Sequence, residues 1–381
     1  MKRKGNLYPI VCEEETIRQA IVLASKGKRR RSDVKKILDN KDYYAHKLHV
    51  VLKAEQFVPS DYRVDTVMDG PMRKKRQIFK PDFYPDQVVH WCIYLAIREW
   101  IYKGFYEFSC GSVPERGVHY GKRFVTKWIR EDHKNTKYYL KMDVTKFYPS
   151  IPIDKLIEKL RRKFKDERLL NLIVLILRKG SGLPIGMLLS QVFANFYLTD
   201  FDHWVKQDLG AVHYLRYMDD MVVFGRSKRE LHRMRREIQA KLAEHGLRLK
   251  GNWQICRLDK EPLDFMGFRF YRDRVTLRRS IMLRITRKVR KVDKKGRRAD
   301  FHDACAVISY LGWIKHSNSH GLFVKWIKPY LHLGRLKGIV RRNQHEALQF
   351  QQHRKAAGVG QDQQRNQNLP PHQYQRGACY G

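Results

Sequence analysis

The sequence has few acidic side chains for its size. It holds 39 Asp and Glu residues against 78 Lys and Arg residues among 381, which leaves a formal net charge of +39 at pH 7. An excess of one sign this large indicates a polyanionic partner, because it costs self-repulsion in any compact state. Nucleic acid is the first candidate, since each neutralised phosphate releases counterions, and an anionic membrane surface is the second. A disordered polycation is excluded, because 43% of the residues are hydrophobic, enough for a sizeable core.

Cysteine pairs and long hydrophobic runs are also missing. The six cysteines, at positions 12, 92, 110, 256, 305 and 379, form no Cys-x-x-Cys motif, and no His/Cys spacing suits zinc. We therefore expect free thiols in a reducing cytoplasm. The longest apolar candidate, residues 169–177, stops at Arg178, well short of the roughly 20 residues that span a bilayer. The N-terminus lacks an apolar segment, so we predict neither a signal peptide nor a membrane span.

Hydrophobic periodicity predicts strands that alternate with helices. This order is typical of an α+β fold with helices on one face of an antiparallel sheet. The Gln/Asn-rich residues 343–381 contain little apolar content and predict a disordered tail. Helices are expected at about 33–54, 84–106, 153–164, 188–208, 230–245 and within 280–342, and strands at about 62–67, 77–79, 138–144, 213–217, 221–224, 265–271 and 274–277.

Two adjacent acids interrupt an apolar strand pattern. Asp219 and Asp220 lie between the expected strands 213–217 and 221–224, where a one-residue turn would bring both carboxylates to an exposed hairpin tip. Each carboxylate would prefer solvent or a cation to an apolar surrounding. A plain polar hairpin tip would explain the pair without any function, but the flanking residues include few turn formers.

A third acid, Asp143, comes at the end of the expected strand 138–144. If this strand neighbours the other two, three carboxylates converge on one sheet edge, where they repel one another and should hold divalent cations. Oxygen ligands together with substrate phosphates suit Mg²⁺. Two metal ions about 3.5–4 Å apart can activate an attacking oxygen and stabilise a leaving one. Together with the net charge, this arrangement predicts phosphoryl transfer on nucleic acid.

The segments around these acids resemble the motifs of reverse transcriptases. Tyr217-Met218-Asp219-Asp220 resembles the catalytic box of that family. The resemblance covers about residues 20–340 and implies a right-hand polymerase fold. Its other motifs follow in family order, with the finger motifs at 74–78 and Arg116-Gly117, the first palm motif at 143–151, the template-and-nucleotide loop at 182–191 and the primer-grip hairpin at 265–268.

The same resemblance implies a division of the chain into domains. We expect an N-terminal extension with fingers over residues 1–135 and a palm over 136–272, in which 160–181 form a finger-side helical insertion. A helical thumb is expected over 273–342, followed by the tail at 343–381.

The loop at 182–191 narrows the resemblance to one group of reverse transcriptases. It reads Ile185-Gly186 and Ser190-Gln191, where most retroviral, intron and retron enzymes carry Gln-Gly and Ser-Pro. This variant resembles the enzymes of diversity-generating retroelements, bacterial or phage polymerases that copy a template-repeat RNA with errors at adenines. The resemblance implies cDNA synthesis for mutagenic retrohoming and a small basic accessory protein as partner.

Two alternatives stay open at this point. One is another bacterial reverse transcriptase, of retron, group II intron-like or abortive-infection type. The other is a non-catalytic RNA-binding protein with the same fold. The intact set of three acids argues against the second alternative, because a pure binder has no reason to hold three repelling carboxylates together.

The resemblance assigns the acids and their ligands. Asp143, Asp219 and Asp220 are implied as the catalytic, metal-binding set, with the Val144 carbonyl as a further ligand. Two Mg²⁺ ions are implied as cofactors, for which Mn²⁺ is an alternative. The implied partners are template RNA, the RNA–cDNA hybrid and deoxynucleoside triphosphates, with no membrane.

A second set is expected to contact the incoming nucleotide. Tyr148 takes the place of an aromatic gate against a 2′-hydroxyl, although its position beside Phe147 also suits a core aromatic. Ile185 stands where relatives carry a Gln and cannot hydrogen-bond, so we hypothesise looser discrimination of the nascent pair unless Ile185 only packs under the loop. The remaining members are Lys74 and Arg76 for the triphosphate, Arg116, Gln191 facing the template, and Lys250, which competes with Arg248 and Lys260 as proton donor to pyrophosphate.

Basic segments are expected to contact the phosphate backbone. A charge run is usually a solvated face, but nine cations within about fifteen residues of the expected thumb, with few acids nearby, favour phosphate contact. The expected nucleic-acid contacts are Lys28, Arg29 and Arg30 in an N-terminal loop, Gly267 in the primer grip, and Arg284, Arg287, Lys288, Arg290 and Lys291 in the thumb.

Overall fold

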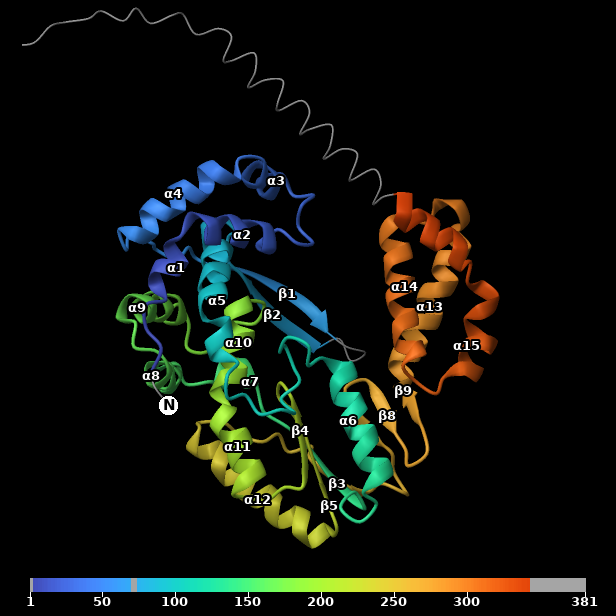
Figure 1. Cartoon of the computed structure of the whole chain (residues 1–381). Coiled ribbons are helices and arrows are strands. Elements are labelled where there is room, and N and C mark those ends of the chain that lie inside the picture. The colour runs from blue at the N-terminus through green and yellow to red at the C-terminus, as the bar shows by residue number, and fades with distance from the viewer. Residues whose placement is uncertain (1–2, 70–73, 343–381) are drawn as a thin grey trace, which may run out of the picture. The chain divides into compact units, whose positions relative to one another are not determined.

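The computed structural model describes residues 3–69 and 74–342, and its contacts divide the chain into two compact units, Met1–Val275 and Thr276–Gly381 (Figure 1). The predicted tail at 343–381, including Cys379, lies outside the described residues. The five described cysteines are free thiols. None of the helices within the described ranges combines the length and hydrophobicity that a membrane span requires.

The first unit begins with helices that pack around one central helix. α1 (Tyr8–Cys12) and α2 (Glu14–Ala24) both contact α5 (Val88–Ile101), which follows the short π-helix η1 (Phe83–Gln87). The single helix expected at about 33–54 is instead two helices, α3 (Ser32–Asp39) and α4 (Lys41–Lys53). The break falls at Asn40, whose backbone leaves the helical region and whose side chain donates to the Lys36 carbonyl.

Two antiparallel strands, β1 (Arg63–Asp69) and β2 (Lys74–Lys80), form a separate hairpin in register from Arg63 opposite Lys80 to Asp69 opposite Lys74. The expected strands at 62–67 and 77–79 are therefore confirmed and extended. Met68 and Asp69 belong to β1, and residues 70–73, between the two strands, lie outside the described residues.

A four-stranded antiparallel sheet in the order β4-β5-β3-β6 forms the centre of the first unit. Its strands are β3 (Tyr138–Asp143), β4 (His213–Tyr217), β5 (Asp220–Gly225) and β6 (Gln254–Arg257), of which β6 was not predicted. Residues 221–225 of β5 are all buried, so both faces of this strand are covered. This corrects the expectation of helices on one face only.

The two covering helices explain why residues 221–224 of β5 are all apolar. α12 (Lys228–Glu244) contacts β3, β5 and β6, and its Leu231 and Met234 belong to the same core as Met221 and Val223. α6 (Val118–Glu131), a helix that the sequence patterns did not predict, contacts β4, and its Trp128 meets the Phe224 ring on the other face (Figure 1).

Five further helices complete the first unit. They are α7 (Phe147–Ser150), α8 (Ile153–Lys163), α9 (Glu167–Leu177), α10 (Leu188–Tyr197) and α11 (Thr199–Gln207). The single helix expected at 188–208 is broken at Leu198 into α10 and α11. Asp166 caps α9 and also accepts hydrogen bonds from the backbone N–H groups of Leu7 and Tyr8, at 2.6 and 2.8 Å, which fastens the N-terminal segment to this helix.

The strand expected at 265–271 is instead a tight hairpin. β7 (Leu263–Phe265) and β8 (Phe268–Phe270) pair antiparallel, and a three-stranded sheet continues to β9 (Val275–Leu277). Met266 and Gly267 form the turn between β7 and β8, and both have left-handed backbones, with φ of +50° and +84°. A two-residue loop that needs positive φ favours Gly, which explains Gly267.

The second unit contains α13 (Arg279–Lys295), α14 (Phe301–Lys315) and α15 (His320–Trp326), with the 3₁₀ turns η2 (Gly296–Arg298) and η3 (Lys328–Tyr330). Asp300 and Asp303 form a capping box at the start of α14. Asp303 also pairs with Lys288 and Lys295 of α13 at 2.8 and 2.5 Å, which links the two helices. The helices expected within 280–342 are confirmed.

Candidate active site

The two adjacent acids lie at a two-residue turn between β4 and β5. Tyr217 is paired with Asp220, so Met218 and Asp219 form the turn, and Met218 has a left-handed backbone with φ of +58°. Both carboxylates are half-buried, and Asp220 is the first residue of β5. The expected one-residue turn is therefore wrong, since the turn has two residues. The tip is less exposed than expected because the Met218 side chain is buried.

The third acid joins this turn from the neighbouring strand. Asp143 lies opposite Asp220 in the β3–β5 register, and the Val144 N–H donates to the Asp219 carbonyl at 3.2 Å. The segment that carries Lys250 pairs with the end of β3 through a β-bridge between Val144 and Leu249. In the same segment the Lys250 N–H donates to the Asp143 carbonyl at 2.8 Å. The structure thus brings Asp143, Asp219 and Asp220 to one end of the central sheet.

Electrostatics at this end of the sheet reflect the crowding of negative charge. Burial, together with the charges of Asp143 and Asp220, raises the pKa of Asp219 to about 6. The Lys250 ammonium donates to Asp143 Oδ2 at 2.5 Å, and this hydrogen bond raises the pKa of Lys250. Asp143 Oδ1 is buried and has no hydrogen-bond partner among the described residues.

The sequence patterns imply that the three carboxylates bind divalent cations. Within the described ranges, no group of three or more His, Cys, Asp or Glu side chains is arranged to hold a metal ion. The donor chemistry nevertheless fits a hard cation, because a buried carboxylate oxygen without a partner is costly and neighbouring carboxylates repel one another. The Val144 carbonyl stays a predicted ligand.

Tyr148 lies close to the acids and anchors the 182–191 loop. Its ring is half-buried, and burial together with the Asp219 charge raises the pKa of the phenol. Its carbonyl accepts from the Leu183 N–H at 3.0 Å. A Cβ at Gly182 would lie 2.2 Å from the Pro149 carbonyl oxygen, so only glycine allows this approach of the loop to α7.

The same loop contacts the β1–β2 hairpin. The Ile185 carbonyl accepts from the Phe79 N–H at 2.9 Å, and the half-buried Ile185 side chain offers no polar atom. Gly186 has φ of +108°, and a Cβ there would lie 2.6 Å from Ile78 Cγ2. Gln191, the last residue of the 182–191 segment, is exposed in the first turn of α10.

Three further predicted nucleotide contacts lie on β2 or just before α6. Lys74 and Arg76 both lie on β2, and Arg76 is exposed. Arg116 is half-buried before α6 and donates to the Tyr106 carbonyl at 3.0 Å. No described contact links Arg116 to the three acids, so its role stays a prediction.

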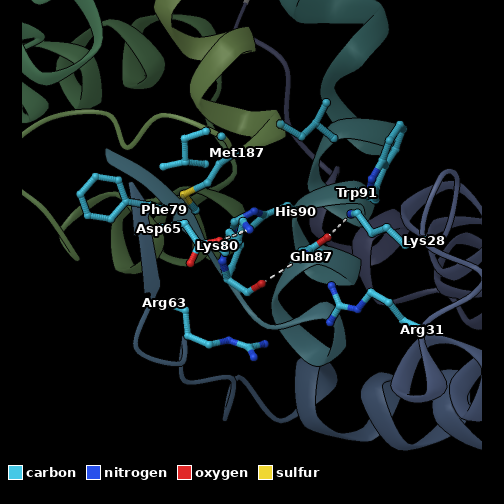
Figure 2. Close-up of a pocket in the computed structure, with 14 residues that line it drawn as sticks. Lys28, Arg31, Arg63, Asp65, Phe79, Lys80, Gln87, His90, Trp91 and Met187 are labelled. Carbon is cyan, nitrogen blue, oxygen red and sulfur yellow. Dashed lines mark hydrogen bonds and ion pairs between the residues drawn. The ribbon is translucent and has the colours of Figure 1, made fainter. Parts of the chain in front are cut away.

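A basic pocket of about 750 Å³ opens beside the 182–191 loop (Figure 2). Lys28 lies in its wall, with its ammonium held by Gln87 and by the Ala24 carbonyl. His90 at the wall is 2% exposed, its Nε2 has no hydrogen-bond partner among the described residues, and burial lowers its pKa to about 4, so the ring is neutral. The polar and aromatic lining comprises Lys28, Arg31, Arg63, Asp65, Phe79, Lys80, Gln87, His90 and Trp91, and Gly186, Met187 and Leu188 come from the 182–191 segment.

The other predicted nucleic-acid contacts differ in their exposure. Arg29 and Arg30 are exposed in the N-terminal loop. On α13 of the second unit, Arg284, Arg287 and Lys291 are exposed, whereas Lys288 pairs with Asp303 and Arg290 lies over the rings of Trp326 and Tyr330 at 5.5 and 4.9 Å. Lys288 and Arg290 therefore also hold the second unit together.

Sequence reasoning missed a buried network directly behind the turn. Arg216 of β4 and Asp202 of α11 form an ion pair at 2.6 Å, and both side chains are at most 1% exposed. Asn195 of α10 accepts from the same guanidinium. A charged residue inside the apolar run 214–224 was the available signal, since charges are almost never fully buried unless they are paired.

Parts of the chain are similar in sequence to known proteins. Residues 86–270 match the family model described as "Reverse transcriptase (RNA-dependent DNA polymerase)". The chain is 27% identical over 211 residues to the retron Ec73 reverse transcriptase of Escherichia coli, covering 50% of this chain and 66% of that protein. It is 31% identical over 109 residues to an uncharacterized 91 kDa protein in the cob intron of Schizosaccharomyces pombe, covering 26% of this chain and 13% of that protein. The chain thus spans less than two thirds of the length of these curated relatives.

Solved structures that align with part of the chain include two telomerases. Apo telomerase from Candida tropicalis aligns with a TM-score of 0.44 and 11% identity, over 56% of this chain and 48% of that chain. Telomerase from Candida albicans, in complex with a TWJ fragment of telomeric RNA, aligns with a TM-score of 0.43 and 12% identity, over 61% of this chain and 49% of that chain.

Proposed function

We propose that this chain is an RNA-directed DNA polymerase that extends a primer on an RNA template, because residues 86–270 match a reverse transcriptase family model. The observation that carries the proposal is the meeting of Asp143, Asp219 and Asp220 at one end of the central sheet, within the matched range. The overall excess of positive charge supports a nucleic-acid substrate.

In this proposal Asp143, Asp219 and Asp220, with the Val144 carbonyl, would hold two divalent cations, Mg²⁺ or Mn²⁺. When bound, such ions supply charge neutralisation at the attacking and leaving oxygens of a phosphoryl transfer. The chain's own contribution is to place the three carboxylates through the backbone pairing of β3, β4 and β5.

Lys250 is the proposed proton donor to the leaving pyrophosphate. Its ammonium reaches Asp143, whereas the competing Arg248 and Lys260 side chains are exposed. A lysine ammonium is protonated at neutral pH, as a proton donor requires, and the hydrogen bond to Asp143 raises the pKa of Lys250 further. In the same state it neutralises part of the charge that the three acids bring together.

The incoming nucleotide is proposed to lie between the acids and the 182–191 loop. Tyr148, near Asp219, would meet the sugar and exclude a 2′-hydroxyl, and Ile185 would contact the nascent pair without a hydrogen bond. Lys74, Arg76 and Arg116 would contact the triphosphate, and Gln191 the template. The support for this set is that the Leu183 and Ile185 backbones tie the loop to α7 and β2.

The basic pocket of Figure 2 is proposed to face the RNA strand near the loop. Its four cations, Lys28, Arg31, Arg63 and Lys80, outnumber the single acid of its lining, Asp65. Replacement of Arg63 by Glu should weaken binding of a labelled RNA and reduce the salt dependence of binding. Unchanged affinity and salt dependence would remove the pocket from the proposed RNA path.

We further propose that the enzyme belongs to a diversity-generating retroelement and copies a template-repeat RNA with errors at adenines, with a small basic accessory protein as partner. The loop sequence Ile185-Gly186 and Ser190-Gln191 supports this subtype. A retron-type polymerase is the second candidate, favoured by the 27% identity to the retron Ec73 enzyme. Sequencing of cDNA made on an adenine-rich template separates the two, since elevated errors confined to adenines are expected only for the first.

Primer extension on an RNA template tests the polymerase itself. The wild-type chain should extend a DNA primer in the presence of Mg²⁺, and Asp219→Ala should not. Asp200→Ala is the matched control, because Asp200 is an exposed acid paired with Lys159 on the protein surface. A wild-type chain that binds the template but extends no primer would favour a non-catalytic RNA-binding protein.

A further inference from the structure

A charged pair is buried directly behind the catalytic turn. The guanidinium of Arg216 donates from Nε to both carboxylate oxygens of Asp202, at 2.8 and 3.1 Å, and from Nη2 to Oδ2 at 2.6 Å. Neither side chain is more than 1% exposed. A buried ion pair of this kind is weak evidence for stability, because the desolvation of both charges offsets their attraction. Its presence in the core therefore calls for another explanation.

Arg216 Nη2 also donates to Ser109 Oγ at 2.9 Å, and the other terminal nitrogen of the guanidinium reaches the turn. Nη1 donates to the Met218 carbonyl at 3.0 Å and to Asn195 Oδ1 at 2.9 Å. The Arg216 backbone is fixed on both sides, since its N–H donates to the Phe108 carbonyl and its carbonyl accepts from the Cys110 N–H, at 3.0 and 2.8 Å. One side chain thus joins Asp202 of α11, Asn195 of α10 and the carbonyl immediately before Asp219.

Asn195 holds the other side of the same turn. Its Nδ2 donates to the Gly111 carbonyl at 2.5 Å and lies 3.3 Å from Met218 Sδ. A Cβ at Gly111 would lie 2.5 Å from Met218 Cγ, so the loop at Gly111 is packed tightly against the Met218 side chain. Met218 is therefore restrained at its carbonyl by Arg216 and at its side chain by Asn195 and Gly111.

These restraints act on a residue whose backbone conformation is unfavourable. Met218 has φ of +58°, a conformation that a non-glycine residue adopts only when its surroundings enforce it. Asp219 follows directly, and Asp220 begins β5, so a relaxation at Met218 would move both carboxylates relative to Asp143.

We propose that Arg216 is a positioning residue for the catalytic acids, and that Asp202 and Asn195 fix it in that role. The inference rests on the proposed polymerase function. The fork of the guanidinium satisfies Asp202, Asn195 and the Met218 carbonyl together, whereas a lysine ammonium at this position keeps the charge but cannot span all three partners. Positioning of the acids thus requires arginine at this site. An experiment can distinguish this positioning from a contribution of Arg216 to the stability of the core.

Arg216→Lys tests this proposal against a purely structural role. The matched control is Tyr214→Phe, which removes the 2.7 Å hydrogen bond from the Tyr214 hydroxyl to Asp202 but leaves every contact to the turn in place. Thermal unfolding should show that both variants fold and that both lose stability. In steady-state primer extension, Arg216→Lys should lose about 100-fold in kcat, with KM for the nucleotide within about threefold of wild type. Tyr214→Phe should keep the wild-type kcat.

Asn195→Ala keeps the test decisive if Arg216→Lys does not fold. This variant retains the ion pair and removes the contacts to Gly111 and Met218, so we expect a loss of about 10-fold in kcat. A folded Arg216→Lys or Asn195→Ala chain with wild-type kcat would overturn the inference while leaving the polymerase function in place. A wild-type chain that extends no primer would overturn both.

Discussion

Asp143, the last residue of β3, lies directly opposite Asp220, the first residue of β5. Five helices and β4 separate them along the chain, so only the strand register makes them neighbours. The ammonium of Lys250 approaches Asp143 from a third segment. The candidate centre is therefore a product of sheet topology, and its chemistry should respond to changes at each of these three segments.

Removal of the Lys250 ammonium should slow catalysis. Lys250→Ala takes away the proposed proton donor and the partner of Asp143, so kcat should fall by about 100-fold with little change in KM. Steady-state primer extension measures both constants. Lys260→Ala is the control, because Lys260 is exposed, and it should behave as wild type. Equal kcat values for the two variants would argue against a catalytic role for Lys250.

Glycine at position 182 should be required for the loop to lie against α7. In Gly182→Ala the new Cβ would lie 2.2 Å from the Pro149 carbonyl oxygen, so the backbone must shift and stability should fall by about 2 kcal/mol. Chemical denaturation measures the loss. Gly180→Ala meets only the Gly182 carbonyl at 3.4 Å, and its unfolding free energy should change by less than about 0.5 kcal/mol. Similar effects of the two substitutions would contradict the close approach.

A hydrogen-bonding side chain at position 185 should change fidelity. Ile185→Gln introduces donor and acceptor atoms next to the loop carbonyl that binds Phe79, and we expect fewer errors at template adenines. The check is sequencing of cDNA made by both proteins on one template. The same error frequency in both would show that Ile185 only packs beneath the loop.

The second unit should lose stability in acid through Asp303. Lys288 and Lys295 hold the pKa of Asp303 well below its usual range. The ionised carboxylate therefore contributes its full stabilisation of the fold at pH values above the pKa of Asp in the unfolded chain, about 4. This contribution is lost as the pH falls below that value. Asp303→Asn should therefore lower the free energy of unfolding by about 1–2 kcal/mol at pH 7, and this difference from wild type should shrink in acid.

Thermal unfolding of the full chain across this pH range measures that difference. Asp273→Asn removes an exposed ion pair with Arg274 and should have little effect at any pH. A difference between Asp303→Asn and wild type that stays constant with pH would mean that the two lysines do not act through the ionised carboxylate.

The sequence allowed three of the four strands of the central sheet to be predicted, together with the meeting of the three acids, because β3, β4 and β5 have clear apolar patterns that end at Asp143 and Asp219. It did not predict β6 or α6. β6 has only four residues and no fully buried side chain, and α6 buries a narrow apolar stripe among basic residues. Local patterns of this kind are too weak to stand out.

Long-range contacts account for the remaining differences between expectation and structure. The helix breaks at Asn40 and Leu198 and the hairpin turn at Gly267 are set by packing and by positive φ, which periodicity does not report. The network around Arg216 joins residues from β4, α10 and α11, and its partners are visible only once those elements are packed. The arginine itself was the one visible sign, as a charge within a buried strand.

The most direct test of the central claim is incorporation of one deoxynucleotide on an RNA template by wild type and by Asp143→Asn. Asparagine keeps the size of the side chain and removes its charge, and Asp143 belongs to the candidate centre only through the β3–β5 register. We predict Mg²⁺-dependent incorporation by wild type and a loss of at least about 1,000-fold in the variant, at unchanged thermal stability. Incorporation by Asp143→Asn at the wild-type rate would contradict the claim that these three acids form one catalytic centre.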